Sequence, residues 1–451
     1  MWFLFILYRA FFRFSAVMKR KIAIVVLFSV LGAGSSLFAQ NVKFKKYFED
    51  ATLRIDYLRT GNRQHDTVGV QKCEKIVGWA GSLTQLLDPF DNGDYRILVK
   101  DAQSGQELYS RGYNSLFREY RDTPEGQEVV AAFEEVVRVP WPKKTVEICF
   151  QERNSNLQMY TQFRYRFDPD SAMTQLKRQS KVRVETDPVK IQYMGDPHKK
   201  VDVVIVPEGY GPADSSKMMR DMRSFCDYLL GQEPFRSRAK DFNVWGVKGL
   251  GEASGITDPG KGIKVNSLVG SSYNTFGSDR YLMTMQLFRL HDAIGSTPFD
   301  HIIIMANSTT YGGGAIYNFY AMSSLNEMAY MVLPHELGHS IGGLADEYVD
   351  EDLSYGDIHS LDQEPTEPNI TTLAEFGLKW ESMLPKGTPV PTPDDASVPR
   401  TENGPLGVYE GAGYHDKGIY RPTMHCMMRD YAPFCPVCAK RLNAIFDLYV
   451  E

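Results

Sequence analysis

The sequence lacks the features that mark a nucleic-acid-binding or repeat protein. Lysine and arginine (50) are outnumbered by aspartate and glutamate (56), giving a formal net charge of -6, and no basic tract stands out beyond the N-terminus. No helix-turn-helix pattern or aromatic and basic platform is visible, so nucleic acid is not an expected partner. No internal repeat is visible either. What remains is a globular composition, 43% hydrophobic and 24% charged, in a chain long enough for two or three domains.

Long apolar runs are also missing, except near the N-terminus. There Lys19–Lys21 precede the run Ile22–Phe38, which ends in small residues before Ala39-Gln40. A basic patch, a short apolar core and a small residue before a polar start predict a signal peptide over residues 1–39, with 1–17 as an upstream extension. The run contains glycine and serine and is short for a bilayer span, which favours cleavage over stable membrane insertion. We therefore expect an exported protein, secreted or retained in the periplasm or at the cell surface.

Cysteine is scarce, with six residues in 451, but three of them lie within 13 positions: Cys426, Cys435 and Cys438. In an oxidising compartment this spacing favours one disulfide that involves Cys426, with either of the other two as partner. A zinc site of the form C-x8-C-x2-C is the alternative, although the sequence does not identify a fourth ligand.

The first half of the chain is dominated by strand signals. Apolar and polar residues alternate in the segments 52–58, 95–99, 145–150 and 157–167, and turns rich in Gly, Asp and Asn separate them. This pattern predicts an antiparallel β-sandwich over residues 41–185. Acids, histidines and thiols do not gather there, so we expect an accessory domain. A polar, proline-containing stretch at 168–198 is predicted to be a linker.

The second half, residues 195–451, has the pattern of an α/β domain. Apolar segments at 201–206, 241–247 and 301–305 predict strands, of which the first and third should be buried on both faces. Helices are expected at 213–230, 280–293 and 434–449, and strands alternating with helices indicate a mixed α/β fold. The segments 263–277 and 354–425 are predicted to be irregular loops.

A metal-binding motif lies inside this half, at His335-Glu336-Leu337-Gly338-His339. In a helix over residues 326–341, His335 and His339 project from one face, one turn apart, so that two imidazoles can bind one zinc ion. Glu336 points away from that face. It can reach a water at the metal and act as general base without competing as a ligand.

A third ligand is expected shortly after this helix. Gly342-Gly343 allow the chain to leave the helix and double back. In the metzincin pattern H-E-x-x-H-x-x-G-x-x-H the third ligand would fall on Ala345, one residue out of register. The nearest oxygen ligand is Asp346, which we prefer, and Glu347 is the next.

Two flanking segments fit the same kind of site. The glycine-rich segment 311–320 predicts an edge strand that could align an extended peptide. The pair Met427-Met428 could form a turn beneath the metal, with Met428 preferred. A tyrosine that stabilises the oxyanion is expected among three candidates, Tyr431, Tyr414 and Tyr420.

Taken together, several segments resemble the bacterial IgA-peptidase family of zinc metallopeptidases. They are VDVVIVPEGY at 201–210, HELGHSIGGLADEY at 335–348, YEGAGY at 409–414, CMM at 426–428 and FCPVC at 434–438. The resemblance covers 195–451 and implies a metzincin-like zincin, with zinc on His335, His339 and Asp346 and Glu336 as catalytic acid and base. The β-rich half looks like the N-terminal domain that accompanies this family.

The expected function is therefore an exported, zinc-dependent endopeptidase that acts on a protein or peptide. The sequence does not encode a recognisable reader of an immunoglobulin A hinge, so that substrate is not carried over. One alternative is a glycopeptidase that acts on a glycoprotein, with the β-domain as glycan reader. Another is an inactive binding protein that keeps the zincin fold.

Overall fold

The computed structural model describes residues 42–171, 188–350 and 359–450. The chain divides into Met1–Lys43 and one compact unit, Phe44–Glu451, and the description below concerns the second. The predicted signal peptide lies outside the described residues, as does most of the predicted linker. Among the described residues, none of the helices has the length and apolar content needed to cross a membrane.

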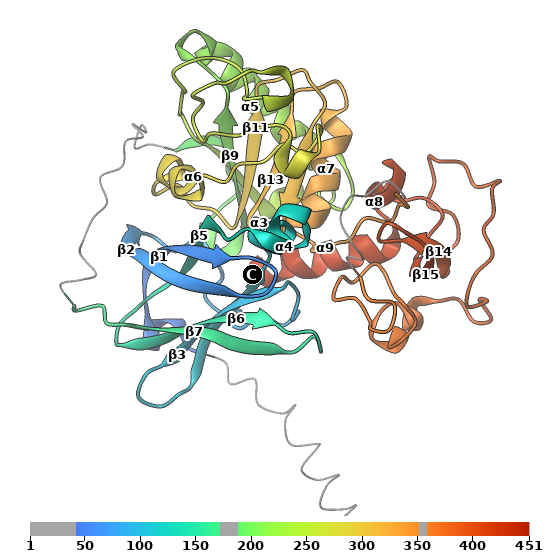
Figure 1. Ribbon diagram of the computed structural model, residues 1–451, viewed down its shortest axis with the longest axis horizontal. Helices are drawn as coiled ribbons and strands as arrows, with labels where there is room; N and C mark the ends of the chain where they lie inside the picture. The colour runs from blue at the N-terminus through green and yellow to red at the C-terminus, as the bar shows by residue number, and fades with distance from the viewer. Residues whose placement is uncertain (1–41, 172–187, 351–358, 451) are drawn as a thin grey trace, which may run out of the picture. The chain divides into compact units, whose positions relative to one another are not determined.

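Two antiparallel sheets make up the N-terminal region (Figure 1). One has the strand order β2-β1-β5 and the other β4-β3-β6-β7. The elements are α2 (Phe44–Tyr47), β1 (Phe48–Gly61), β2 (Asp66–Val77), β3 (Tyr95–Asp101), β4 (Glu107–Tyr113), α3 (Leu116–Asp122), α4 (Pro124–Glu128), β5 (Ala131–Pro142), β6 (Val146–Arg153) and β7 (Met159–Phe167).

Aromatic side chains join these two sheets face to face. The Tyr57 ring of β1 lies 4.9 Å from the Phe150 ring of β6, centroid to centroid, and the Trp141 ring of β5 lies 5.3 Å from that of Phe167 in β7. Such edge-on pairs bury large apolar area between two sheets. The predicted β-sandwich is confirmed.

The C-terminal region is built on a six-stranded mixed sheet with the order β12-β13-β11-β9-β10-β8. Its strands are β8 (Val189–Gln192), β9 (Val201–Glu208), β10 (Phe242–Gly246), β11 (His301–Ala306), β12 (Gly313–Ile316) and β13 (Tyr320–Ser324). The four central strands are parallel, whereas β12 and β8 run antiparallel at the two edges. β9 and β11 are buried throughout, as their apolar sequences predict.

Helices and the sandwich cover opposite faces of this sheet. Along β9, Val203 and Ile205 point into a core shared with α5 (Ser215–Gly231), α7 (Ala329–Ser340) and α9 (Pro436–Tyr449). Val204 and Val206 point into a second core, which contains α6 (Leu287–Ile294), α3 and part of β5. The sheet is therefore covered on both faces, as expected for a mainly parallel sheet, and the N-terminal region supplies part of one cover.

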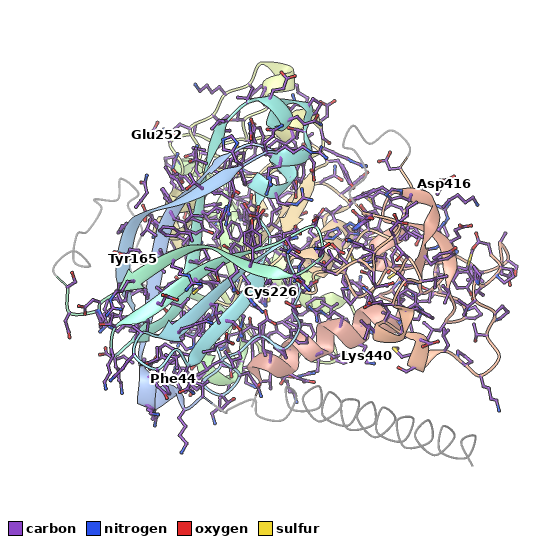
Figure 2. The ribbon with its side chains drawn as sticks, turned by 60° about the horizontal axis from the view of Figure 1, so that its bottom comes forward. Phe44, Tyr165, Cys226, Glu252, Asp416 and Lys440 are labelled. Carbon is purple, nitrogen blue, oxygen red and sulfur yellow. The ribbon has the colours of Figure 1, made fainter. Side chains whose placement is uncertain are left out.

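Three details of the predicted secondary structure were wrong. The helix expected at 280–293 forms only from Leu287, because Tyr281 and Met283 make bridges to Gly313 and Ser272. Residues 189–192 of the predicted linker form β8 and complete the sheet. The predicted loop region 354–425 contains a hairpin, β14 (Tyr409–Ala412) with β15 (His415–Arg421), where Asp416 stands in Figure 2. Short helices complete the chain: α8 (Met427–Asp430) and 3-10 turns at Pro197–Lys199, Pro212–Asp214, Ala239–Asp241, Pro259–Lys261, Thr275–Gly277, Phe376–Leu378 and Glu381–Met383.

Candidate active site

Helix α7 brings the two motif histidines together. His335 and His339 lie one turn apart, and their Nε2 atoms are 3.2 Å from each other. The helix packs against β12, β13 and α5, and His335 is 9% exposed. The histidine pair predicted from the four-residue spacing is therefore present on one face of a helix, as the geometry of an α-helix requires.

A glycine turn then carries the chain back to these histidines. Gly343 has a φ of 58°, a left-handed conformation that glycine adopts readily. Beyond the turn, Asp346 Oδ1 lies 3.1 Å from His335 Nε2 and 3.3 Å from His339 Nε2. Three donor atoms thus converge on one point, and Asp346 is the third member, one residue beyond the metzincin register.

The outer nitrogens of both imidazoles are already in use. His335 Nδ1 lies 2.9 Å from the Met427 carbonyl, and His339 Nδ1 lies 2.7 Å from the Leu344 carbonyl. A carbonyl only accepts, so each Nδ1 is the protonated nitrogen, and in the neutral ring each Nε2 offers a lone pair. Two nitrogen lone pairs and a carboxylate oxygen repel one another at these distances, and a cation bound between them removes that repulsion.

The spacing of the three donor atoms also suits a metal ion. Ligands of a tetrahedral zinc with Zn–N distances of ~2.05 Å are ~3.3 Å apart, and the three separations here are 3.1, 3.2 and 3.3 Å. The His339 side chain is 20% exposed, so one side of the cluster is open. An open position is what distinguishes a catalytic site from a structural one.

The electrostatics of the cluster favour positive charge. Burial lowers the pKa of His339, but Asp346, Glu336 and the Leu344 carbonyl together raise it to about 9. Burial raises the pKa of Asp346, yet the two histidines hold it well below its usual range. The carboxylate therefore stays ionised and stabilises a cation at this point.

Glu336 lies beside the edge strand. A Cβ placed on Gly313 of β12 would be only 3.0 Å from Glu336 Oε1, so the missing side chain leaves room for the carboxylate. Burial raises the pKa of Glu336, and the adjacent His335 and His339 lower it. A raised pKa makes this carboxylate a better proton acceptor, as a general base requires.

β12 is the outermost strand, as predicted for this segment, but its free edge is shorter than expected. The Gly313 N–H donates to Arg280 O at 3.3 Å, and its carbonyl accepts from Leu282 N–H at 3.2 Å. Because backbone groups alternate in direction along a strand, Ala315 presents its N–H and carbonyl on the same side as Gly313. The Tyr317 carbonyl in turn accepts from Asn114 N–H at 2.9 Å, so the free part of this edge is at Ala315.

The predicted methionine lies under the active helix. A Cβ on Gly338 would stand 2.3 Å from Met428 Sδ, so the fully buried Met428 packs directly against the helix between the two histidines. Its neighbour Met427 supplies the carbonyl that orients His335. The segment thus supports the cluster by packing and by a hydrogen bond.

The three candidate tyrosines occupy different places. Tyr414 donates its hydroxyl hydrogen bond to Asp346 Oδ2, on the side away from the histidines. The Tyr431 ring lies 5.6 Å from the His335 ring, and its hydroxyl is 2.8 Å from that of Tyr311. Tyr420 pairs with Glu410 in the β14–β15 hairpin. Tyr414 therefore orients a donor of the cluster, and Tyr431 stands beside it.

Comparison with known proteins agrees with this geometry. The IgA Peptidase M64 family model matches residues 189–404 and 396–446, more than half of the chain, and the peptidase M64 N-terminus model matches residues 43–164. The chain belongs to the M64 IgA peptidase family. This family is one of metallopeptidases, and the described residues contain candidate metal-binding groups. No curated protein matches the M64 chain.

In this M64 chain, Glu347 points away from the histidines into a different cluster. Its Oε1 lies 3.2 Å from Cys438 Sγ and 2.9 Å from Asn369 Nδ2. The predicted disulfide was wrong, because all six cysteines are free and Cys426 Sγ lies 3.8 Å from Cys438 Sγ, against an S–S bond of ~2.05 Å. Asp346 and Glu347, adjacent in sequence, thus belong to two separate sets of donor atoms.

The N-terminal region of the M64 chain is less remote from the site than expected. Glu119 of α3 accepts a hydrogen bond of 2.6 Å from Tyr281, and burial raises the pKa of Glu119 to about 7. Asn92 Nδ2 lies 3.3 Å from the Gly343 carbonyl in the turn after the active helix. Sequence reasoning missed both residues, since no local pattern links them to a motif more than 200 positions away.

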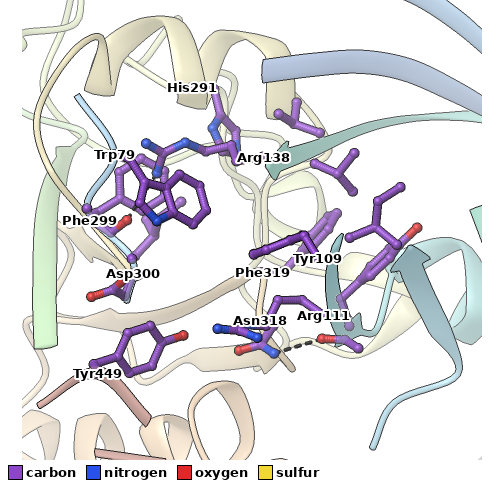
Figure 3. A pocket seen from close by; sticks show the side chains of 18 residues that line it. Trp79, Tyr109, Arg111, Arg138, His291, Phe299, Asp300, Asn318, Phe319 and Tyr449 are labelled. Atoms are coloured by element: carbon purple, nitrogen blue, oxygen red, sulfur yellow. Dashed lines mark hydrogen bonds between the residues drawn. The ribbon is translucent and has the colours of Figure 1, made fainter. Parts of the chain in front are cut away.

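A cavity of about 110 Å³ lies apart from these donor atoms (Figure 3). Its wall comes from both halves of the M64 chain and includes Trp79, Arg138, Asp300 and Tyr449. Asn318 lines the same cavity and donates a hydrogen bond of 2.7 Å to Gly112 O. None of His335, Glu336, His339 and Asp346 lines this cavity, so it is not the candidate active site.

Proposed function

We propose that this M64 peptidase is a zinc-dependent endopeptidase whose metal is held by His335, His339 and Asp346. The observation that carries the proposal is the convergence of two oriented Nε2 atoms and one carboxylate oxygen at mutual distances of 3.1 to 3.3 Å. Two imidazoles and one carboxylate form the donor set of many catalytic zinc sites. When bound there, zinc supplies Lewis acidity for hydrolysis of a carbonyl.

Glu336 has the position and the pKa direction of a general base in this reaction. It takes the proton from the attacking water and later passes it to the leaving amine, so one carboxylate serves both steps. Its burial raises the pKa, which strengthens it as an acceptor. Tyr431, beside His335, is placed to donate a hydrogen bond to the oxygen that becomes negative during attack.

The substrate binds as an added strand along β12. The main-chain groups of an edge strand pair with any extended peptide, so this mode positions the scissile bond without requiring one side chain. Gly313 lets the backbone approach Glu336 closely. The proposal therefore concerns peptide bonds in an extended segment, and it does not extend the family name to the substrate of this chain.

We further propose that the protein is exported after removal of residues 1–39, and that residues 41–185 and 195–451 are its two domains. The basic patch and the apolar run Ile22–Phe38 support export. Intact-mass measurement of the protein recovered from the producing cell tests the cleavage, and an N-terminus that still includes the run Ile22–Phe38 would contradict it.

Metal exchange tests the proposed activity. The purified chain should cleave casein or a mixed-peptide library, lose that activity after chelation, and recover it when zinc is restored. Product masses should show internal peptide bonds cut. Activity that survives complete metal removal would refute the metal mechanism. A chain that binds zinc but cleaves no peptide would instead be a zincin-fold binding protein.

A further inference from the structure

A second set of metal-ligating side chains lies next to the candidate active site. Glu347, Cys426, Cys435 and Cys438 each offer one ligand atom, and these atoms all lie within 4.8 Å of one another. All four residues are 0% exposed. Four donor atoms with no open side are the arrangement of a structural zinc site, in contrast to the partly open histidine cluster.

The separations of these atoms fit a shared ion. A tetrahedral zinc with Zn–S distances of ~2.3 Å holds its sulfurs ~3.8 Å apart, and Cys426 Sγ lies 3.8 Å from Cys438 Sγ. Cys438 Sγ lies 3.2 Å from Glu347 Oε1. The first of these distances is too long for a disulfide and matches one edge of a tetrahedron around a metal.

The surroundings supply backbone donors to the sulfurs, and the charge of the buried Arg421 acts on Glu347 without a hydrogen bond between the two. Cys435 N–H points to Cys426 Sγ at 3.4 Å, and Cys438 N–H points to Cys435 Sγ at 3.5 Å. Cys435 is the N-cap of α9 and Cys438 lies in its first turn, where the helix dipole favours negative charge. Glu347 Oε2 is fully buried and has no hydrogen-bond partner among the described residues. An unpartnered buried carboxylate oxygen beside three sulfurs is costly unless a metal ion takes it as a ligand.

We propose that Glu347, Cys426, Cys435 and Cys438 bind a second, structural zinc ion. The ion would join two segments that each carry part of the histidine cluster. Asp346 directly precedes Glu347, and the Met427 carbonyl that orients His335 directly follows Cys426. Glu347 N–H also donates to Met428 O at 2.8 Å, so a backbone hydrogen bond already links the two segments. The second ion holds these two segments together and so positions Asp346 and His335.

This site goes beyond the proposed function and does not rest on it. A disulfide between Cys426 and Cys438 is the competing state. It would remove two donors and leave Cys435 and the unpartnered Glu347 Oε2 buried beside it, whereas a zinc ion uses all four side chains. The observed set therefore favours the metal.

Metal content of a variant without the histidine cluster tests the site. The purified full-length His339→Ala chain should retain about one zinc per chain after dialysis, against about two in the wild type. After cobalt replacement, both should show the same thiolate-to-cobalt absorption, because only the cysteine cluster contains sulfur. A His339→Ala chain without zinc, or cobalt-loaded protein without thiolate absorption, would overturn the proposal.

Two further variants assign the ligands. Cys438→Ser should remove the thiolate-to-cobalt absorption and one zinc, while Cys226→Ser, at a buried free cysteine in α5, should change neither. Glu347→Gln should retain the sulfurs but lose the second zinc more readily to a chelator. Intact mass under denaturing, non-reducing conditions should show six free thiols, and a loss of two hydrogens would mean a disulfide and refute the site. If Cys438→Ser does not fold, the His339→Ala result still decides.

Discussion

Replacing Tyr414 with phenylalanine removes the hydroxyl that holds one oxygen of Asp346. The Tyr414 hydroxyl donates to Asp346 Oδ2, which leaves Oδ1 turned toward both imidazoles. Burial, and then the Asp346 charge, raise the pKa of Tyr414 well above its usual range, so the hydroxyl remains a donor at neutral pH. Phenylalanine keeps the ring and loses only that donor.

The loss of zinc affinity in Tyr414→Phe can be estimated in two ways. A buried hydrogen bond to a charged group contributes about 1.5–3 kcal/mol. Removing a residue that orients a metal ligand typically costs about 10–100-fold in metal affinity, which corresponds to about 1.4–2.8 kcal/mol. The two ranges agree, so Tyr414→Phe should weaken zinc binding about 10–100-fold at the histidine cluster.

Competition with a chromogenic chelator measures this affinity, and Tyr431→Phe is the matched control. Tyr431 lies beside His335 but makes its hydroxyl contact with Tyr311. Tyr431→Phe should therefore lower kcat while zinc affinity stays within about threefold of wild type, since an oxyanion donor acts in the transition state. Unchanged zinc affinity in Tyr414→Phe would refute the assigned role of Tyr414, and an equal loss in both variants would refute the distinction.

Two other predictions concern the edge strand and the sheet. Gly313→Val would force a side chain against Glu336 and Met322 O and should lower kcat/KM at least about tenfold. In the control Gly69→Val nothing lies within 4 Å of the added side chain, so kcat/KM should stay unchanged. Equal activity of the two variants would contradict the close approach of β12 to Glu336. Burial raises the pKa of Asp202 to about 7, so this carboxyl costs no stability below its unfolded pKa of about 4 and destabilises the fold as pH rises through 7. Asp202→Asn should therefore raise Tm relative to wild type at pH 8 but not at pH 4, and an advantage that is the same at both pH values would show that burial of the charge is not the cause.

Much of this fold could be predicted because its signals are local. The buried runs in β9 and β11 and the alternation in the sandwich strands follow from which faces are covered. The same locality explains the errors. Residues 280–286 have helical composition, but Tyr281 and Met283 form bridges to distant segments. β8 is short and half-exposed, so its sequence carries little strand signal until β10 pairs with it.

The site likewise contains residues that local sequence predicts and residues that distant contacts determine. His335, Glu336, His339 and the glycine turn lie within a few residues of each other, so helix geometry alone brought the histidines together. The choice between Asp346 and Glu347 depends on which side of the chain each carboxylate takes, and that is set by contacts with Tyr414 and Cys438, about 70 and 90 positions away. The fourth ligand of the cysteine cluster was missed because Glu347 was considered only for the histidines.

Glu336→Gln at full zinc occupancy tests the central claim most directly. Glutamine has the size of glutamate but cannot accept the proton, so removing a general base should cost about 10²–10⁴-fold in kcat. We expect that loss for hydrolysis of a mixed-peptide library, with zinc content equal to that of the wild type. Cleavage by Glu336→Gln at the wild-type rate would contradict it.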